Sequence, residues 1–534
     1  MKQRILVSLT LILLCLPLLY PFIQSGFFPT HDGEWAIVRL TEMVREIKDL
    51  QIPPRMSTFL NHGFGYPLFL FTYPFPYYLG SFLHLLGLGY VSSIKILFIF
   101  SVLGSAVSMY IFTSKLWGKW GGLLSATLYI YAPYRLVNLY IRGSLGESFT
   151  FVLLPLIFLG FYELYAKPAF KWMCLGAFGL ALLIITHNAM ALLFAPFLVF
   201  WLLILYFECA DKIKFSKFIL VTLGVGIALS AYFWLPVIIE KKYISLNKIS
   251  LTNISDNFVT IQELINSKWS LDSVRPPLQL GVLHTFLFIG TIVLIFIRKN
   301  KLLLQLFFIF STIITIFLIL PFSYSYWKLP LFKEIDFPWR MLGISMFMLS
   351  VSVGSISKLL FKPVMSCLIV MSVIVYNLQY IQTQPLVRKS DEYYETNDAT
   401  TTSADELMPV WVHIKPKNRA PDLAVFINPM NTNVFNKKIL SDYFSFSVQS
   451  KSSNTLIVNQ VYFPGWDAYV DSKKRILKIT ENTGLMSLNI ENGYHTVELK
   501  FNKTPVRIIS DLLSLSALLT IVGICLYSKK LFQS

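Results

Sequence analysis

The sequence predicts an all-α polytopic membrane bundle of about 12 transmembrane helices with one small β-rich domain outside the membrane. Three observations predict this fold. Of the 534 residues, 55% are hydrophobic and only 14% are charged, whereas soluble proteins carry about 25% charged residues. Apolar runs of about 20 residues, long enough to cross a bilayer core, recur along most of the chain. Lys and Arg gather in short clusters between these runs, which is typical of cytoplasmic loops.

The apolar runs give the order of the crossings. We expect transmembrane helices at residues 5–23, 92–114, 120–136, 149–166, 172–186, 189–208, 217–238, 280–297, 302–320, 341–358, 364–381 and 507–527. The run 67–87 is also apolar, but three prolines interrupt it, and proline inside a helix costs about 3 kcal/mol or more. If this run does not cross, Lys115 and Lys119 lie on the same side as Lys2 and Arg4, together with the later basic clusters. The positive-inside rule therefore favours a re-entrant or interfacial segment, with both termini in the cytoplasm of a multi-pass cell-membrane protein.

The formal net charge of +17 does not indicate nucleic-acid binding. A nucleic-acid-binding protein gathers its basic residues on one face or in one tract. Here the basic residues are spread between apolar runs, so we attribute the charge to membrane topology and expect no nucleic-acid partner.

This topology divides the chain into three parts. Residues 1–381 form the transmembrane module, residues 382–506 an extracytoplasmic β-sandwich-like domain, and residues 507–534 a final transmembrane helix with a short cytoplasmic tail. Four larger outer loops of the module are expected at 24–91, 136–148, 239–279 and 321–340. Within the β-rich domain, strands are expected at 455–458, 467–470, 485–490 and 495–501, because turn-forming pairs separate these short runs.

The first outer loop contains two carboxylates at the start of an amphipathic pattern. Asp32 and Glu34 precede apolar residues with helical spacing, which predicts a helix lying in the membrane interface. Local sequence favours Asp32 as an N-cap and Glu34 as a first-turn partner of the helix dipole. The alternative is that a carboxylate at the membrane surface deprotonates an acceptor hydroxyl or orients a substrate.

Further polar residues stand where helices meet the outer surface. Arg142 and Glu147 could form a phosphate-binding and acid/base corner, or Arg142 could extend to the interface while Glu147 caps a helix. His187 is either a site residue at a helix end or a hydrogen-bonded structural histidine. Arg340 could contact the phosphate of a lipid substrate at the outer end of a helix. An arginine in this position more often contacts the headgroups of ordinary membrane lipids.

Together these motifs resemble the bacterial membrane proteins labelled "6-pyruvoyl-tetrahydropterin synthase-related". The resemblance rests on Thr30-His31-Asp32-Gly33, Pro53-Pro54-Arg55, Gly63-Phe64-Gly65-Tyr66-Pro67, Arg142-Gly143 with Glu147, His187-Asn188, Trp234-Leu235-Pro236 with Glu240, Phe337-Pro338-Trp339-Arg340 and Phe463-Pro464-Gly465-Trp466. The label refers to pterin chemistry, but a soluble pterin synthase needs a zinc-binding histidine set, and the 7 histidines of this chain are scattered.

The architecture is also similar to that of the GT-C glycosyltransferases. That resemblance implies a membrane glycosyltransferase that moves a sugar from a polyprenyl-phosphate carrier to an envelope polymer or glycan acceptor, inverting the anomeric carbon. It places Asp32, Glu34 and Glu147 in catalytic roles. It also makes His31, Arg142, His187 and Arg340 substrate-binding residues.

The resemblance implies membrane lipid as a partner and no redox cofactor. Whether the protein uses a divalent metal stays open, because the sequence shows no set of metal ligands.

Two alternative functions would use the same residues differently. A transporter or flippase for lipid-linked sugar would bind the same ligand without making a bond, and a non-catalytic scaffold would bind envelope polymers through its β domain.

Overall fold

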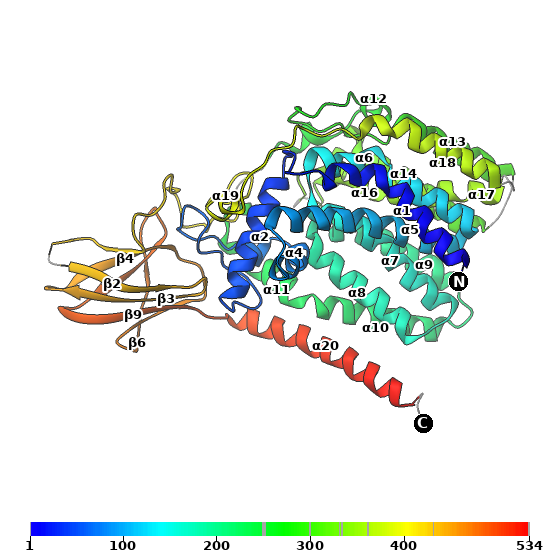
Figure 1. Cartoon of the computed structure of the whole chain (residues 1–534). Helices are drawn as coiled ribbons and strands as arrows, with labels where there is room; N and C mark the ends of the chain where they lie inside the picture. Colours follow the sequence, from blue (N-terminus) through cyan, green and yellow to red (C-terminus); the bar gives the residue numbers. More distant parts are fainter. Residues whose placement is uncertain are drawn as a thin grey trace.

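The computed structural model describes the chain except residues 1, 248–251, 298–300, 330, 331, 333, 334, 360–362, 431 and 532–534. The helices are α1 (Lys2–Ile23), α2 (Gly33–Lys48), α3 (Leu68–Phe71), α4 (Phe75–Leu85), α5 (Tyr90–Ile130), α6 (Pro133–Val137), the π-helical turn η1 (Asn138–Arg142), α7 (Leu145–Ala166), α8 (Phe170–Thr186), α9 (Asn188–Glu208), α10 (Lys212–Leu229), α11 (Ala231–Glu240), α12 (Ile261–Ile265), α13 (Val282–Ile297), α14 (Leu302–Ile319), α15 (Tyr324–Trp327), α16 (Met341–Gly354), α17 (Ile356–Leu359), α18 (Pro363–Asn377), α19 (Asp391–Glu395) and α20 (Pro505–Leu531). Figure 1 shows a helical bundle at one end and a β domain at the other.

Each predicted crossing coincides with an apolar helical segment. Among the described residues, seven helices are long and apolar enough to cross a membrane, and the bent pair of α10 and α11 is an eighth if it counts as one span. Three further apolar helices, α8, α13 and α18, are shorter. Helix α5 covers two predicted crossings, because Gly118 (φ +78°) interrupts it and Gly122 then lies against Tyr110 and Ser114. The chain therefore turns back within α5.

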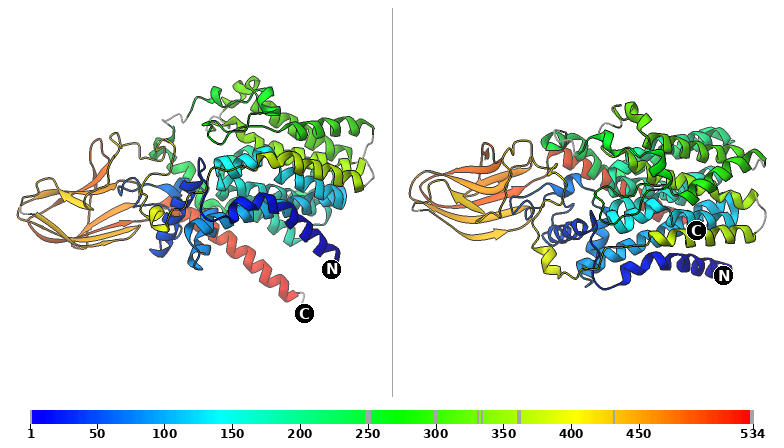
Figure 2. Two further views of the ribbon diagram at one scale, coloured as in Figure 1. Left: turned by 45° about the horizontal axis from the view of Figure 1, so that its top comes forward. Right: turned by 90° about the horizontal axis from the view of Figure 1, so that it is seen from above.

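Basic clusters from different loops meet at one end of the bundle. The Lys358 side chain lies beside Gly118, and Lys115 forms an ion pair with Glu163 (2.8 Å). Lys301 donates a hydrogen bond to Tyr162 on the same helix as Glu163 (3.3 Å). The start of α1 and the end of α20 lie at this end, away from the β domain, in all three views (Figures 1 and 2). This arrangement agrees with the prediction that an even number of membrane crossings separates one basic cluster from the next. Residues 298–300 and 360–362, which belong to two of the predicted clusters, lie outside the described part of the chain.

The run 67–87 consists of the two short helices α3 and α4. Pro74 and Pro76 stand at the start of α4, whose 11 residues are too few to span a membrane core of about 30 Å. Helix α4 packs against α2 and α5, and α2 lies across the ends of the bundle helices (Figure 1). These short helices form a layer between the bundle and the β domain.

Among the residues that the structure describes, nine strands form two antiparallel sheets. The strands are β1 (Ala424–Phe426), β2 (Thr432–Ile439), β3 (Tyr443–Ser450), β4 (Asn454–Val461), β5 (Trp466–Val470), β6 (Lys473–Arg475), β7 (Lys478–Ile479), β8 (Leu485–Ile490) and β9 (Gly493–Phe501). One sheet has the order β1-β4-β8-β7 and the other β2-β3-β9-β5-β6. Alternate residues of β3 and β4 are buried, including Phe444, Phe446, Leu456 and Val458, so each sheet has an apolar inner face. The four predicted strands correspond to β4, β5, β8 and β9.

Residues 382–423 differ from the prediction of a β-rich domain over 382–506. They contain the short helix α19 and irregular segments, and the first strand begins only at Ala424. These segments contact the outer layer of the bundle: Phe27 and Val387 form an isolated β-bridge, and the Tyr66 hydroxyl accepts a hydrogen bond from the Leu407 N–H (3.0 Å). The polar composition of this stretch therefore reflects a long connection over the bundle rather than strands.

A buried ion pair joins the β domain to the bundle. Arg507, at the start of α20, donates to the Glu240 carboxylate at the end of α11 (2.9 Å) and to the Pro464 carbonyl in the β domain (2.8 Å). Both side chains are almost fully buried. Because burying one charge without its partner is costly, this pair fixes the β domain relative to α11 and α20.

Candidate functional site

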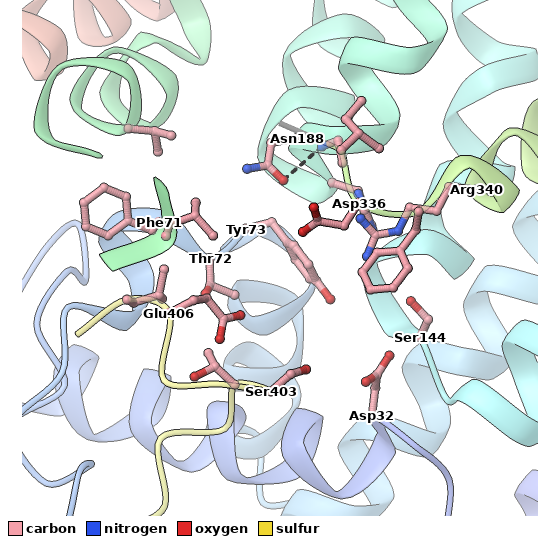
Figure 3. A pocket seen from close by; sticks show the side chains of 18 of the residues that line it. Asp32, Phe71, Thr72, Tyr73, Ser144, Asn188, Asp336, Arg340, Ser403 and Glu406 are labelled. Atoms are coloured by element: carbon pink, nitrogen blue, oxygen red, sulfur yellow. Dashed lines mark hydrogen bonds between the residues drawn. The ribbon is translucent and has the colours of Figure 1, made fainter. Parts of the chain in front are cut away.

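A cavity of about 420 Å³ lies where the outer ends of the helices meet the connection from the β domain. Four sequence-predicted site residues line it: Asp32, Arg142, His187 and Arg340. They come from four segments that are far apart in the chain. Figure 3 shows Asp32 and Arg340 on one side of an open space, facing Glu406 and Thr72 on the other.

Backbone pairing brings Asp32 to Arg142. The N–H groups of His31 and Asp32 donate to the carbonyls of Ile141 (3.0 Å) and Arg142 (2.7 Å). This close approach depends on Gly143, which has φ +62°; a Cβ there would lie 2.1 Å from the Thr30 hydroxyl. Although Asp32 holds the N-cap position of α2, its side chain makes no capping hydrogen bond. The carboxylate instead lines the cavity.

Glu147 lies behind Arg142 and holds it. The Glu147 side chain is fully buried and forms an ion pair with Arg142, while its other oxygen accepts a hydrogen bond from Tyr134. Arg142 also donates to the Asn138 side chain (2.5 Å). Burial lowers the pKa of Arg142, but the adjacent Glu147 carboxylate outweighs this effect and raises that pKa above its ordinary value. Arg142 is therefore a fixed cation, and Glu147 is a positioning residue that does not line the cavity.

Arg340 brings a second guanidinium group to the same wall. The Trp339 ring lies between the two arginines, 4.6 Å from the Arg142 guanidinium and 5.8 Å from that of Arg340. Within the described part of the chain, no carboxylate forms an ion pair with Arg340, and its buried Nε has no hydrogen-bond partner. Because its guanidinium group lines the cavity, Arg340 can donate charge-assisted hydrogen bonds to an anionic ligand there.

His187 is neutral and has a local structural role. Its Nδ1 accepts a hydrogen bond from the Met190 N–H (3.3 Å) at the start of α9, and its ring stacks on Tyr73 (5.4 Å). Burial, together with the positive charge of Arg340, lowers the pKa of His187 to about 3. Nδ1 accepts, so the proton of the neutral ring is on Nε2.

Besides Glu147, two more predicted site residues, Glu34 and His31, do not line this cavity. Glu34 forms an ion pair with Lys389 in the connection to the β domain (2.7 Å). His31 lines a separate, open depression with Asp272 and Gln384, and burial lowers its pKa. Of the neighbouring Asp32 and Glu34, only Asp32 reaches the cavity, because successive helix positions point in different directions.

The cavity contains functional groups that the sequence analysis did not identify. They include Arg39, Tyr73, Lys241, Asp336, Thr402, Ser403 and Glu406. Tyr73 belongs to the proline-interrupted run, and Gly146 lets its ring approach, since a Cβ on Gly146 would lie 2.5 Å from it. Thr402, Ser403 and Glu406 lie in the connection that composition assigned to the β domain, so no periodic pattern marked them.

One wall of the cavity thus combines Arg142 and Arg340 with the Asp32 carboxylate, which has no capping role. This set can bind an anion such as a phosphate and place a base beside it. Among the described residues, no group of three or more His, Cys, Asp or Glu side chains is arranged to hold a metal ion.

The sequence from residue 70 to residue 384 matches the family described as "6-pyruvoyl-tetrahydropterin synthase related domain; membrane protein". The chain belongs to this family. It is also 25% identical over 249 residues to an uncharacterized protein of Lactococcus lactis subsp. cremoris (strain MG1363). That match covers 45% of this chain and 40% of the relative, so this chain spans less than half the length of the relative.

Solved structures of two membrane enzymes are similar to this family member. The mycobacterial arabinofuranosyltransferase AftD matches 71% of this chain and 26% of its own, with 13% identity and a TM-score of 0.48. The apo oligosaccharyltransferase of Archaeoglobus fulgidus matches 75% of this chain and 60% of its own, with 14% identity and a TM-score of 0.43.

Proposed function

We propose that this protein is a membrane glycosyltransferase that moves a sugar from a polyprenyl-phosphate carrier to an extracytoplasmic acceptor of the cell envelope. The observation that carries the proposal is the cation Arg340, without an ion-pair partner among the described residues, on the same wall as Arg142 and Asp32. A polyprenyl-phosphate sugar presents both a phosphate for the arginines and an anomeric carbon beside it.

In the proposed reaction, the lipid tail stays in the bilayer and the phosphate contacts Arg142 and Arg340. The acceptor hydroxyl attacks the anomeric carbon, and its proton passes to the Asp32 carboxylate. The new bond joins the acceptor oxygen to the anomeric carbon, while the bond from that carbon to the phosphate oxygen breaks and its electron pair leaves with the phosphate. The two arginines stabilise the negative charge that develops on the leaving phosphate. One displacement inverts the anomeric carbon.

The proposed orientation in the membrane follows from the positive-inside rule. The end of the bundle with Lys115, Lys301 and Lys358 would face the cytoplasm together with both termini. The cavity would then open outside, at the level of the headgroups where a carrier phosphate lies.

The test is transfer and release of radiolabelled sugar from a panel of polyprenyl-phosphate hexoses and pentoses by the purified protein. Replacing Asp32 by Asn removes the base, so we expect turnover to fall by about 10²–10⁴-fold while binding of polyprenyl phosphate persists. Glu34→Gln is the matched control, because Glu34 lies on the same helix but pairs with Lys389 outside the cavity, and it should keep turnover.

The outcomes separate this proposal from its rivals. Equal turnover by wild type and Asp32→Asn would refute the role of Asp32. Binding of polyprenyl phosphate without sugar release from any donor would instead favour a transporter or flippase, and absence of binding would favour a scaffold.

A further inference from the structure

The connection from the β domain supplies one wall of the cavity. We name residues Thr400–Leu407 the strap. Two residues of the outer layer hold it: the Arg39 guanidinium donates to the Thr401 carbonyl and hydroxyl, and the Tyr66 hydroxyl is 2.8 Å from the Thr402 hydroxyl. A buried tyrosine and a clamped arginine therefore fix the strap over the end of the bundle.

The strap presents oxygen atoms to the cavity. Thr402, Ser403 and Glu406 all line it, and Figure 3 shows Ser403 and Glu406 across the open space from Arg340. One Glu406 oxygen accepts a hydrogen bond from the Ala404 N–H (3.1 Å). In the part of the chain that the structure describes, the other Glu406 oxygen and the Ser403 hydroxyl have no hydrogen-bond partner within the protein.

The cavity therefore has two walls of different chemistry. The wall built by the ends of the bundle helices offers the guanidinium groups of Arg142 and Arg340 together with the carboxylates of Asp32 and Asp336. The strap offers a carboxylate and two hydroxyls. The cations Arg39 and Lys415, which contact the strap, already donate to Thr401 and to Ala404 and Asp405, respectively. A carboxylate accepts hydrogen bonds from sugar hydroxyls, whereas it repels a phosphate.

We propose that the strap binds the acceptor and that the acceptor is a saccharide held through its hydroxyls rather than a phosphate-rich polymer. This inference rests on the proposed function, and it assigns the second substrate of the same cavity. The donor phosphate contacts the arginine wall, the acceptor sugar contacts Ser403 and Glu406, and Asp32 lies beside the space between the two walls.

The experiment compares wild type with Glu406→Gln and Ser403→Ala in two assays. The first measures sugar transfer from a radiolabelled polyprenyl-phosphate donor to a neutral oligosaccharide or to an oligomer of glycerol phosphate. The second measures release of the sugar to water without acceptor. Glu406→Gln keeps an oxygen that can accept from the Ala404 N–H, so the strap should keep its local structure. Glu392→Gln is the matched control, because this exposed carboxylate lies on the same connection outside the cavity.

We expect wild type to use the neutral oligosaccharide in preference to the glycerol phosphate oligomer. A hydrogen bond to a charged group contributes about 1.5–3 kcal/mol, so the acceptor KM of Glu406→Gln should rise about 10-fold or more, with a smaller rise for Ser403→Ala. Release to water should stay within about twofold in both variants, because it uses only the donor side of the cavity, and Glu392→Gln should match wild type.

Two results would overturn the inference, and they are distinguishable. If release to water occurs but both strap variants keep the wild-type acceptor KM, or if glycerol phosphate is the better acceptor, the acceptor assignment is wrong while the proposed function stands. If wild type releases no sugar from any donor, the proposed function fails and the acceptor assignment fails with it.

Discussion

Replacing Glu147 by Gln should both destabilise the protein and make it more responsive to an anionic ligand. The Glu147 side chain is fully buried and that of Arg142 is 7% exposed. Removing one partner of such a pair costs about 3–5 kcal/mol, because the other charge stays buried. Tyr134 and Asn138 still contact Arg142 in the variant, so we expect a loss near the lower limit of that range.

Thermal unfolding in detergent, with and without polyprenyl phosphate, measures both effects. A phosphate can replace the missing carboxylate as the counterion of Arg142, so the same ligand concentration should raise the Tm of Glu147→Gln more than that of wild type. A ligand at 100 times its Kd stabilises a protein by about 2.7 kcal/mol, which is comparable with the expected loss.

Glu163→Gln is the control for this prediction. Glu163 lies on the same helix, but its partner Lys115 is 48% exposed at the opposite end of the bundle, and pairs of this kind contribute about 0–1 kcal/mol. If Glu147→Gln melts like Glu163→Gln, or if polyprenyl phosphate shifts both variants equally, Glu147 is not the counterion that holds Arg142 in place.

Three further predictions concern single residues. Gly143→Ala places a Cβ 2.1 Å from the Thr30 hydroxyl and should lower sugar turnover by displacing the Asp32 loop, whereas Gly224→Ala, with open space around it, should not; equal turnover would refute the close approach. Arg340→Ala should weaken polyprenyl phosphate binding by about 10-fold or more, because a charged hydrogen bond contributes about 1.5–3 kcal/mol; an unchanged Kd in a direct binding assay would contradict this. Burial raises the pKa of Glu42 to about 7 despite the opposing effect of Arg45, so the folded state holds this proton more tightly than the unfolded state, and stability is lost as the pH rises from about 4.5 through 7. Glu42→Gln should therefore lose less Tm than wild type between pH 5 and pH 8, and parallel losses would refute the assignment.

Hydropathy and basic clusters predicted the bundle because membrane burial acts on whole segments. All the expected crossings coincide with apolar helical segments, and the turn at Gly118 falls between Lys115 and Lys119 as expected for a loop. Four strands of the outer domain, β4, β5, β8 and β9, were also predicted. Strands β1, β2, β3, β6 and β7 were not: β1, β6 and β7 have only two or three residues each, and β2 is largely exposed.

The cavity could be predicted only in part. Asp32, Arg142, His187 and Arg340 were recognisable because ionisable residues that face the interior of a membrane bundle are candidates for function and because they lie in the motifs that carry the family resemblance. Helical spacing separates Asp32 from Glu34, but the ion pair of Glu34 with Lys389, 355 positions away in the chain, could not be predicted from the sequence. The strap depends on Arg39 and Tyr66, and no local pattern links these residues to Thr401 or Thr402.

The order in which the walls of the cavity occur along the chain has a consequence for biosynthesis. Asp32 leaves the ribosome early, Arg142 and His187 follow, and Arg340 and Glu406 come much later. The Arg142–Glu147 pair can form within one hairpin, but the cavity closes only when the segment after residue 400 has been synthesised and has packed on the bundle. A nascent or truncated chain that ends before residue 400 would therefore hold the arginine wall of the cavity without its opposite wall. Transfer activity would then depend on translation reaching the β domain.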